Sequence, residues 1–427
     1  MNDRQPAFGI NFYGHVTGNF GLAVAARNTL LAMRANDVDA CVVDIDAGGG
    51  RSGHDDTYSS LACASPSGTF PISLFHTNPT DVYSYAIETP ASTWAPDRLR
   101  ILVPFWELPL IPEGLWTEFI SAMDMVLAPT LFIAEAIRTR CPQTNVVHYP
   151  QAVFLPDGVA PDRARFGMPE SAFVCVTVMD ASSGFERKNP FASVTAFREA
   201  FGDLGPDEVR LVVKMTDRRG AREFSGQLEE FREQAESDPR ILVIEESMSY
   251  RDVLSLNASA DVLLSLHRAE GLGLNLMEAM SLGTVVLGTA WSGNMDFMTA
   301  ENSILVGCNP TPVESAHPSY APEVVGEGQY WMEPDGVEAA AGLRRLYDDR
   351  ALLASLAEQA RSDMDAARGA FLRCEWAGDV HALFDAGTLG SAEHAARSAA
   401  FAQVMRVNPL RRMRRGLGNV ARRFGML

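Results

Sequence analysis

The feature that most constrains the fold is the presence of two successive series of short apolar runs, each run followed by a stretch with helical periodicity. Such alternation is typical of parallel sheets covered by helices. The proline-rich connection "YPQAVFLPDGVAPDRARFGMP" separates the two series. At 427 residues, the chain is also too long for one ordinary core. The sequence therefore predicts an α/β protein with two Rossmann-like, doubly wound domains facing a cleft.

Each series can be followed along the chain. In the first, "FGINFYG", "DACVVDID", "RILVPFWEL" and "DMVLAPT" are the expected strands, with helices over residues 22–34 and in "LFIAEAIRTR". In the second, the expected strands are "AFVCVTVMD", "VRLVVKMTD", "RILVIEES", "ADVLLSLH" and "GTVVLGTA". Residues 47–70 and 309–329 are rich in Gly, Ser and Pro, which favours loops.

Composition narrows the class of protein. The six cysteines are scattered without a C-x-x-C pair, which argues against a zinc site or a disulfide scaffold and fits a reducing cytosol. The N-terminus has no apolar signal-peptide core and no run of eighteen apolar residues occurs, so we expect a cytoplasmic protein. The net charge of −18 disfavours nucleic acid as a partner.

Lysine is rare in this chain. Only Lys188, in "FERKNP", and Lys214, in "LVVKMTD", occur among 36 basic residues. One interpretation is that both sites need a compact, mobile ammonium group; the other is chance in an arginine-rich sequence. Both lysines lie near the ends of expected strands of the second series, where ligands of parallel sheets bind. On the residues alone, both interpretations remain open for Lys188 and for Lys214.

The turn after the first strand is rich in glycine. Gly14, Gly18 and Gly21 allow a tight turn and a close backbone approach to a ligand, before a helix N-terminus that favours anions. The pattern is not G-x-G-x-x-G, and Asp44 or Asp46 match its usual acidic partner only loosely. A plain strand-to-helix turn and a ligand-contacting loop both remain open, whereas a dinucleotide dehydrogenase is disfavoured.

The segment "HRAEGLGLNLMEAMSLG" carries two glutamates eight residues apart, Glu270 and Glu278. Backbone N–H groups of Gly271, Leu272, Gly273 and Leu274, at the start of an expected helix, suit a diphosphate. One carboxylate could orient sugar hydroxyls and the other could accept both ribose hydroxyls. Taken alone, the pair is better explained by an ordinary helix start, because chance pairs of acidic residues are common in a chain this acidic.

This segment resembles the signature of retaining, family-4 type glycosyltransferases with the GT-B fold, E-x-F-G-L-x-x-x-E-A-M-x-x-G-x-P-V-V. Seven positions match in register, whereas Leu272 replaces the usual Phe. The resemblance extends over "FERKNPFASVTAFREAF" and "FISAMDMVLAPTLFIAEAI", and it is looser in the first domain. The matching residues are Glu270, Gly273, Leu274, Glu278, Ala279, Met280 and Gly283.

The resemblance implies a division of the chain. Residues 1–155 would form the acceptor-side domain and residues 156–370 the nucleotide-sugar donor domain. Residues 371–395 would be a crossover helix that returns to the first domain, and residues 396–427 a basic tail.

It also implies roles in the donor site. Lys188 would contact the donor diphosphate, Glu270 would be catalytic through charge and orientation, and Glu278 would bind the ribose. The family's usual arginine, six residues before that lysine, is replaced by Ser182. The remaining candidates for the diphosphate and sugar are Ser182, Ser183, Lys214, Gly271, Leu272, Gly273, Leu274, Gly18 and Gly21.

Three further stretches carry alternatives. Ser247, Met248 and Ser249 are candidates for the nucleobase, or Ser249 simply caps a helix. The turn Trp291–Asn294 lies where similar enzymes have a Gly-Gly turn beside the phosphates, although a tryptophan is more often core. In the first domain Trp106 and Glu107 occupy the region of the family's sugar-facing histidine, and His76 is an alternative cleft residue.

Together these features predict a retaining, metal-independent hexosyltransferase. It would move a hexose from a nucleotide-diphosphate sugar to a glycan or lipid-linked acceptor in bacterial-type cell-surface polysaccharide or glycolipid synthesis. Lys188, Glu270 and Glu107 are the catalytic candidates, and no cofactor is expected. The alternatives are a catalytically degenerate sugar-nucleotide-binding partner and another enzyme on a similar fold, such as an epimerase.

The C-terminal tail differs from the acidic body. Residues 401–427 contain seven arginines and no acid. Apolar residues recur there at helical spacing, and the arginines between Arg411 and Arg423 occupy other faces. Such a basic amphipathic helix is typical of contact with an anionic membrane surface. A frayed terminus, or a segment docked on the acidic body, remains the alternative.

Overall fold

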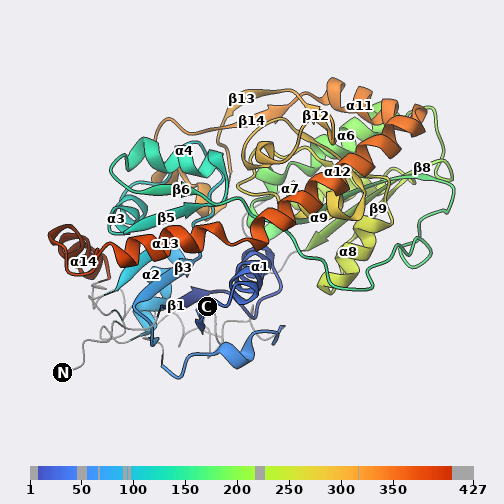
Figure 1. Cartoon of the computed structure of the whole chain (residues 1–427). Coiled ribbons are helices and arrows are strands. Elements are labelled where there is room, and N and C mark those ends of the chain that lie inside the picture. The colour runs from blue at the N-terminus through green and yellow to red at the C-terminus, as the bar shows by residue number, and fades with distance from the viewer. Residues whose placement is uncertain are drawn as a thin grey trace, which may run out of the picture.

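Two six-stranded parallel sheets, each covered by helices, form the framework of the computed structural model (Figure 1). The predicted contributions of Asp46, of the Ser182 side chain and of the tail beyond residue 405 lie outside the residues that the structure describes. Those described residues are 8–45, 55–65, 68–89, 94, 98–216, 227–315 and 317–405.

The first sheet has the strand order β2-β1-β3-β4-β5-β6, and all its neighbours pair in parallel. Apolar residues line both faces of its central strands, as expected for a sheet covered on both sides. β3 is a buried strand that the sequence interpretation left out. The elements are β1 (Ile10–Gly14), α1 (Gly21–Ala35), β2 (Ala40–Asp44), β3 (Ile72–His76), α2 (Pro79–Glu88), β4 (Leu99–Leu102), α3 (Leu115–Ser121), β5 (Met125–Ala128), α4 (Leu131–Arg140) and β6 (Val146–His148).

The second sheet has the order β12-β11-β10-β7-β8-β9, again parallel throughout. Its elements are β7 (Phe173–Asp180), α5 (Phe185–Lys188), α6 (Pro190–Ala200), β8 (Val209–Thr216), α7 (Gln227–Glu236), β9 (Ile241–Ile244), α8 (Tyr250–Ala258), β10 (Val262–Ser265), α9 (Leu274–Leu282), β11 (Val285–Thr289), β12 (Ser303–Val306) and α11 (Gly336–Asp348).

The strand orders locate the crevice where a ligand would bind. In the second sheet, successive strands are added on one side of β7 up to β9 and then on its other side from β10 onward, so the strand order switches between β7 and β10. In the first sheet the same switch lies between β1 and β3. Ligands of open parallel sheets bind outside the carboxyl ends of the strands at such switch points. The loops after β1, β3, β7 and β10 are therefore the positions to inspect.

An antiparallel hairpin is inserted after β12. Its strands are β13 (Cys308–Pro312) and β14 (Tyr330–Pro334), and the segment between them contains the short helix α10 (Pro322–Val325). The sequence predicts only a loop over residues 309–329, because β13 is polar and contains proline. Proline and polar residues are tolerated in such an edge strand because its outer side meets water.

The C-terminal helices link the two domains. α12 (Arg350–Leu372) and α13 (Glu375–Asp385) run across the molecule from the second domain to the first, and α14 (Ala392–Val404) lies at the far end (Figure 1). The ring of Tyr149 stacks on Phe371 at a centroid distance of 5.5 Å and meets Trp376 edge-on at 5.6 Å. Among the described residues, no helix is long and apolar enough to cross a membrane.

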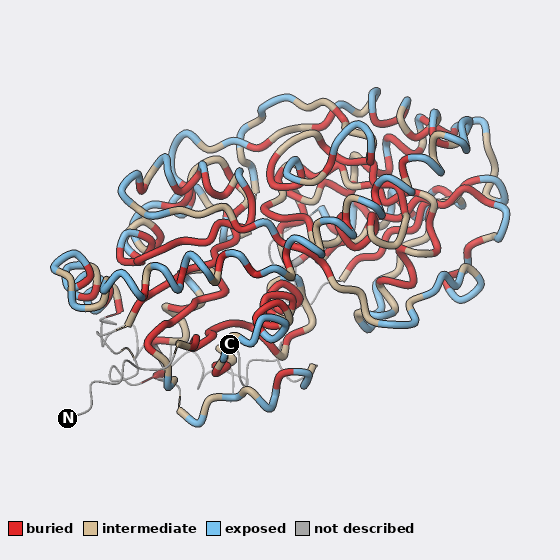
Figure 2. Tube along the Cα trace, viewed as in Figure 1, coloured by how far each residue is buried: buried red, intermediate tan, exposed pale blue. Residues whose placement is uncertain are grey.

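The core is continuous between the domains. Buried segments follow the strands through both halves of the molecule, while the outward faces of the helices are exposed (Figure 2). One apolar cluster joins Ile10 and Leu74 of the first sheet to Val174 and Leu263 of the second, through Phe371. Burial of this shared apolar surface favours a fixed arrangement of the two domains.

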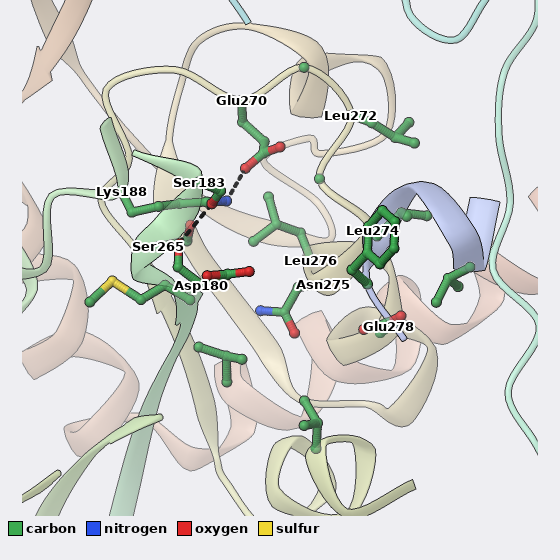
Figure 3. A pocket seen from close by; sticks show the side chains of 18 of the residues that line it. Asp180, Ser183, Lys188, Ser265, Glu270, Leu272, Leu274, Asn275, Leu276 and Glu278 are labelled. Carbon is green, nitrogen blue, oxygen red and sulfur yellow. Dashed lines mark hydrogen bonds and ion pairs between the residues drawn. The ribbon is translucent and has the colours of Figure 1, made fainter. Parts of the chain in front are cut away.

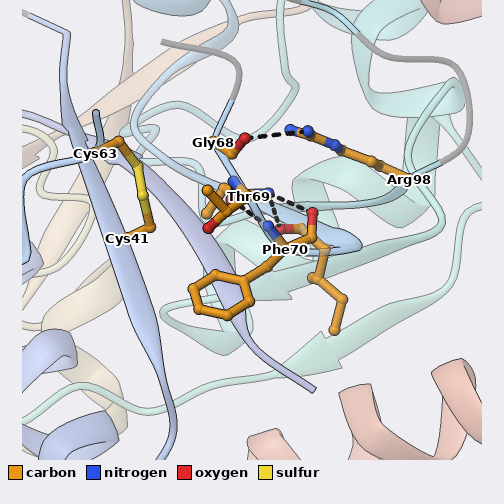
Figure 4. Close-up of a disulfide and its surroundings, with 8 residues drawn as sticks. Cys41, Cys63, Gly68, Thr69, Phe70 and Arg98 are labelled. Carbon is orange, nitrogen blue, oxygen red and sulfur yellow. Dashed lines mark hydrogen bonds between the residues drawn. A yellow bond between two sulfur atoms is a disulfide. The ribbon is translucent and has the colours of Figure 1, made fainter. Parts of the chain in front are cut away.

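Two cysteines are paired, although their scattered positions in the sequence argue against a disulfide scaffold and favour a reducing cytosol. Cys41, in β2, and Cys63 form a disulfide with a Cα–Cα distance of 5.0 Å (Figure 4). They meet because the segment before Cys63 runs beside β2, where the Cys63 N–H donates to the Val42 carbonyl at 2.8 Å. Cysteine usage therefore gives no support for a reducing compartment.

Candidate functional site

A cavity of about 420 Å³ opens at the carboxyl ends of both sheets. The first domain contributes residues after β1, Asn78 after β3, and Phe105 and Glu107 after β4. The second domain contributes the ends of β7, β8 and β10 and the first half of α9. The cavity therefore lies at the switch points of both sheets, where the fold predicts a ligand.

The motif "FERKNP" turns Lys188 into this cavity. Gly184 and Asn189 have left-handed φ angles of 105° and 52°, so α5 is a single short turn before Pro190 begins α6. The Lys188 ammonium thereby reaches the Glu270 carboxylate, with a distance of 2.5 Å between Nζ and Oε2 (Figure 3). This ion pair joins the loops that follow β7 and β10.

The loop that carries Glu270 is fixed on the opposite side. The Glu270 N–H donates to Ser292 Oγ at 3.0 Å, and the Gly293 N–H donates to the Glu270 carbonyl at 2.9 Å. Burial alone would raise the pKa of Glu270, but Lys188, Arg187 and His267 outweigh it and hold the pKa well below its usual range. Glu270 is therefore ionised at neutral pH and carries a fixed negative charge.

Glu107 faces the same region from the first domain. Its side chain is 24% exposed and its Oε1 lies 4.0 Å from Arg187 Nη2. Burial raises the pKa of Glu107 and the Glu270 charge adds to this, whereas Arg187, Lys188 and a hydrogen bond from Tyr320 lower it. The net pKa is above the ordinary value, so Glu107 holds its proton more readily than an exposed glutamate.

Glu278 lies farther along the cavity, beyond Asn275 and Leu276 (Figure 3). It is buried on the first turns of α9, and the Tyr250 hydroxyl donates to its Oε1 at 2.7 Å. Burial raises the pKa of Glu278 to about 7, although the tyrosine hydrogen bond lowers it. Its charge thus depends on pH in the neutral range.

The N-terminus of α9 completes this wall. Gly273 precedes the helix with φ 87°, a conformation that glycine adopts without strain. A Cβ on Gly271 would lie 2.7 Å from the Trp106 carbonyl oxygen, so the two domains approach each other here through backbone. Helix N-terminal amides favour anions, which makes this wall suitable for phosphate oxygens.

Most of the predicted site residues line the cavity. Ser183 is among them, and its hydroxyl donates to the Asp180 carbonyl at 2.7 Å. The predicted residues in the lining are Gly21, Glu107, Ser183, Lys188, Met248, Glu270, Gly271, Leu272, Gly273, Leu274 and Glu278.

Four predicted residues do not line it. Lys214 is buried in β8 and its ammonium donates to Thr216 Oγ1 at 2.9 Å, so it lies behind Thr216, which does line the cavity. Ser249 caps α8 by accepting the Asp252 N–H at 3.2 Å. The Gly18 carbonyl accepts from Arg27, and Ser247 lies outside the lining.

The first-domain alternatives do not line the cavity. His76 is fully buried, with its Nε2 3.0 Å from Thr29 Oγ1, and burial lowers its pKa to about 3. The Trp106 indole donates to the Leu110 carbonyl at 2.7 Å. Asp44 accepts from the Thr17 backbone N–H at 3.1 Å rather than facing the cavity.

Sequence reasoning missed three residues that shape the site. Arg187 is buried next to Lys188 and reaches both Glu107 and Glu270. Tyr250 donates to Glu278, and Tyr320 comes from the hairpin insertion. Tyr250 could have been suspected because it follows the proposed base-binding stretch, whereas nothing local marks Arg187 or Tyr320.

No group of three or more His, Cys, Asp or Glu side chains suited to a metal ion occurs in the described part of the chain. The cavity itself brings Lys188 together with four carboxylates, those of Glu107, Asp180, Glu270 and Glu278. A polar ligand with many hydroxyl groups can satisfy such acceptors, which alone would repel an anion.

Comparison with known families identifies the second domain. Residues 185–317 match the family model described as glycosyl transferases group 1. This segment is a glycosyl transferases group 1 domain. It contains Lys188, Glu270 and Glu278, so the glycosyltransferase segment supplies most of the polar wall of the cavity. No curated protein sequence matches the chain.

Solved structures share the fold. Sucrose-phosphate synthase from Thermosynechococcus elongatus is 13% identical, with a TM-score of 0.61 over 89% of this chain and 100% of its own. Anabaena HepE, in complex with UDP and glucose, is 15% identical, with a TM-score of 0.56 over 88% and 100%. The two parallel sheets and these likenesses confirm the predicted GT-B fold.

A further structure is larger than this chain. The pneumococcal O-GlcNAc transferase GtfA, in complex with UDP and GlcNAc, is 18% identical, with a TM-score of 0.48 over 76% of this chain. The chain spans 58% of the length of that transferase.

Proposed function

We propose that the protein is a retaining glycosyltransferase that moves a hexose from a nucleotide-diphosphate sugar to a glycan or lipid-linked acceptor. The observation that carries the proposal is the Lys188–Glu270 ion pair of 2.5 Å near the N-terminus of α9, within the glycosyl transferases group 1 segment. A cation for the leaving diphosphate and a carboxylate for the sugar are thus adjacent in one cavity.

The donor would lie along the second-domain wall. Glu278 would accept the ribose hydroxyls, and Met248 would contact the base. The amides from Gly271 to Leu274 and the Lys188 ammonium would bind the diphosphate. The positions of the two glutamates support this order, because Glu270 precedes α9 and Glu278 lies on it, at opposite ends of the same wall (Figure 3). Since the HepE structure contains UDP and glucose, a uridine-linked hexose is the first donor to test.

Transfer would depend on preorganised charge. As the bond between the anomeric carbon and the phosphate oxygen breaks, negative charge grows on the diphosphate and positive charge on the sugar ring. Lys188 would stabilise the former, and the ionised Glu270 would orient hydroxyls and stabilise the latter. Glu107 would face the sugar from the first domain. The acceptor would attack the face from which the diphosphate leaves, so that the configuration is retained without a glycosyl-enzyme and without a divalent metal.

The acceptor would lie against the first-domain wall of the cavity. The first-domain wall contains Asn19, Asn78 and Glu107, which suit hydroxyl groups of a glycan. The basic tail predicted from sequence would bring the enzyme to an anionic membrane surface, which fits a lipid-linked acceptor on the cytoplasmic face. We therefore propose a role in bacterial-type cell-surface polysaccharide or glycolipid synthesis.

A thermal-shift panel tests the donor site. UDP-, GDP- and dTDP-linked sugars would be added, with and without magnesium, to the wild-type protein and to Lys188→Ala. We expect one nucleotide class to raise Tm without magnesium, and the increase to be lost in Lys188→Ala because a charged hydrogen bond to phosphate contributes about 1.5–3 kcal/mol. Lys188→Arg, which keeps the charge, should retain part of the shift.

The other outcomes separate the alternatives. No shift with any nucleotide would exclude the donor site. A shift without sugar transfer or donor hydrolysis would favour the degenerate sugar-nucleotide-binding partner. A shift that survives in Lys188→Ala would show that Lys188 does not bind the diphosphate.

A further inference from the structure

Arg187 and Lys188 are adjacent in sequence and approach the same carboxylate oxygen. Lys188 Nζ lies 2.5 Å from Glu270 Oε2, and Arg187 Nη1 lies 3.6 Å from that oxygen. Lys188 lines the cavity, whereas the buried Arg187 side chain is not part of the lining. In the described part of the chain, no hydrogen bond to Glu270 Oε1 occurs. The two basic groups thus hold one oxygen of Glu270, and the other oxygen is available to a ligand hydroxyl.

The second terminal nitrogen of the same guanidinium faces the first domain. Arg187 Nη2 lies 4.0 Å from Glu107 Oε1. Glu107 follows β4 of the first sheet, and both Glu107 and Glu270 line the cavity. One buried cation therefore lies between two carboxylates that belong to different domains. Opposite charges in such a buried setting attract each other more strongly than they do in water.

Backbone carbonyls fix the Arg187 side chain. Its Nη1 donates to the Ala269 carbonyl at 2.8 Å, and its Nη2 donates to the Ser183 carbonyl at 3.1 Å. The Arg187 carbonyl in turn accepts the Arg268 N–H at 2.8 Å. Because Ala269 directly precedes Glu270, Arg187 contacts both the backbone and the side chain of the loop after β10. The planar guanidinium makes these contacts together, which the compact ammonium of a lysine cannot do.

Arg187 also offsets the acidity of the cavity. Among the described residues that line it, Lys188 is the one basic side chain, beside four carboxylates. The charge of Arg187 lowers the pKa of Glu270 and opposes the rise that burial causes in the pKa of Glu107. A buried carboxylate needs such a partner, because an uncompensated buried charge is costly.

We propose that Arg187 is a positioning residue for sugar transfer: its buried guanidinium holds Glu270 and Glu107, one from each domain, in a fixed arrangement before the donor binds. This inference rests on the proposed function. Arg187 touches no substrate in this arrangement and acts through the two carboxylates. With Oε2 of Glu270 held, its Oε1 is oriented toward the sugar hydroxyls, so that little reorganisation is needed during transfer.

Arg187→Met tests the proposal, because methionine keeps an unbranched apolar side chain and removes the charge. With UDP-glucose as the first donor, we expect kcat to fall about 10- to 100-fold, the range for the loss of one charged contact. Arg187→Lys keeps the charge but loses the planar fork. Its kcat should lie between those of the wild-type protein and Arg187→Met, which makes it the second variant if Arg187→Met folds poorly.

Arg163→Met is the matched control. Arg163 also donates to two backbone carbonyls, those of Ser259 at 3.0 Å and Ala172 at 2.9 Å, and pairs with Asp261 at 3.0 Å. It belongs to the second domain but is not part of the cavity lining. Its replacement should lower Tm, whereas kcat measured well below that Tm should change by less than about 2-fold because the site is independent of the cavity.

A double-mutant cycle supplies a readout that a purely structural role would not move. Glu107→Gln should lower kcat in the wild-type protein but change it by less than about 3-fold in Arg187→Met, where the carboxylate is already displaced. In Arg163→Met, the same substitution should keep its full effect. Additive losses from Arg187→Met and Glu107→Gln would overturn the proposal, as would an equal loss of kcat in Arg163→Met.

The acidic limb of the pH profile is a second readout of this kind. Arg187 lowers the pKa of both Glu107 and Glu270, so both pKa values should rise when it is removed. The acidic limb of kcat should therefore move to higher pH in Arg187→Met and stay in place in Arg163→Met. The other charged and titratable groups that face the two carboxylates are Lys188, His267 and Tyr320.

A third measurement does not depend on activity. Arg187→Met should lower Tm, and adding Glu107→Gln should recover part of the loss, because the buried carboxylate left without its partner is then neutral. Adding Glu107→Gln to Arg163→Met should give no such recovery. If the wild-type protein transfers no sugar from any donor, the proposed function fails, while the recovery of Tm still tests whether Arg187 holds Glu107. A Tm that does not recover would overturn the proposal.

Discussion

At the scale of single residues, Glu278 shows how burial can make a binding site sensitive to pH. Its carboxyl group is 5% exposed and receives one hydrogen bond, from Tyr250. Burial in this setting raises its pKa to about 7. Because the folded pKa lies above the ordinary value of 4.5, the contribution of this group to stability is largest at acidic pH. This stabilising contribution, at most about 3 kcal/mol, is lost as the pH rises from the ordinary pKa toward 7.

The same shift predicts the pH dependence of nucleotide binding. If Glu278 accepts the ribose hydroxyls as a carboxylate, only the ionised fraction binds well, and that fraction rises from about one tenth at pH 6 to about nine tenths at pH 8. We expect the nucleoside diphosphate to bind about 10-fold more weakly at pH 6 than at pH 8, by isothermal titration calorimetry. Glu278→Gln should bind weakly at both pH values. A wild-type affinity that does not change between pH 6 and 8 would contradict the ribose assignment.

Residue-level prediction from sequence located residues of the cavity wall where the predicted site residues are local in the chain. Glu270, Gly273 and Glu278 lie within nine residues, and all three line the cavity. Lys214 shows the limit, because the strand-end argument ignored depth along the strand. It lies on the same face of β8 as Thr216, two residues deeper, so Thr216 lies between its ammonium and the cavity.

Arg187 and Tyr320 show a different limit. Arg187 is adjacent to Lys188 in sequence, yet it does not line the cavity: its guanidinium donates to the buried Ala269 and Ser183 carbonyls and lies 3.6 Å from Glu270. Tyr320, which lowers the pKa of Glu107, lies more than two hundred residues further along the chain, and no periodicity or spacing links the two. Contacts made by tertiary packing leave no local pattern, so only the structure reveals them.

At the scale of elements, the loop after β10 is held by backbone contacts with no room for a side chain. Besides the close approach of Gly271 to Trp106, the Thr130 hydroxyl donates to the Gly271 carbonyl at 3.1 Å. A Cβ on Gly293 would lie 2.0 Å from that same carbonyl oxygen. The loop that carries Glu270 therefore packs closely between the first domain and the turn after β11.

We predict that Gly271→Ala disturbs this contact. The added Cβ would lie 2.7 Å from the Trp106 oxygen and 3.1 Å from its carbonyl carbon, and backbone atoms cannot rotate away as a side chain can. Overpacking of this kind costs about 1–3 kcal/mol. Differential scanning calorimetry should show a Tm several degrees lower, and sugar transfer should fall because Glu270 is the next residue.

Gly336→Ala is the control for this substitution. Gly336 begins α11, and a Cβ there would meet no atom within 4 Å. Its Tm should equal or slightly exceed that of the wild-type protein. A Gly271→Ala variant as stable and as active as Gly336→Ala would mean that the two domains are not held at the observed distance.

The strands that could be predicted from sequence are those with the most apolar residues. The central strands of both sheets are continuous apolar runs, so the sequence reveals them and their parallel class. β3 was left out although it is buried, since "ISLFH" is short and follows the Gly- and Ser-rich residues 47–70. β13 is half exposed and has the sequence "CNPTP", which is typical of a loop; only its pairing with β14 makes it a strand.

At the scale of the whole molecule, the C-terminal helix α14 completes the first domain. Phe401 is 2% exposed, and its ring lies 5.6 Å from Phe119 and 5.9 Å from Phe75. Polar contacts accompany it: His394 Nδ1 lies 3.1 Å from the buried Asp124 carboxylate. The end of the described chain therefore covers apolar surface that the first domain cannot bury alone.

We predict that Phe401→Ala lowers the free energy of unfolding by about 3–5 kcal/mol, the usual cost of removing a buried phenylalanine. Urea denaturation followed by tryptophan fluorescence would measure it, since Trp94 is near the affected surface. Gln403→Ala, at an exposed position two residues further along α14, should change stability by less than about 0.5 kcal/mol. Equal stability of the two variants would mean that α14 is not part of the first-domain core.

The basic tail belongs to the same scale, because the membrane contact proposed for it would place the whole molecule at a membrane surface. Its seven arginines contrast with an acidic body, and its apolar residues recur at helical spacing. Truncation after Met405 keeps α14, so Tm and nucleotide binding should stay unchanged. In contrast, co-sedimentation with vesicles containing anionic lipid should be lost, and wild-type binding should weaken with salt because each arginine near the surface contributes about 1 kcal/mol electrostatically.

Replacing Arg411, Arg412, Arg414 and Arg415 with alanine in the full chain isolates that electrostatic part. Equal sedimentation of the truncated and full-length chains would exclude the tail as the membrane contact, and the acceptor would then have to be recognised by the cavity alone.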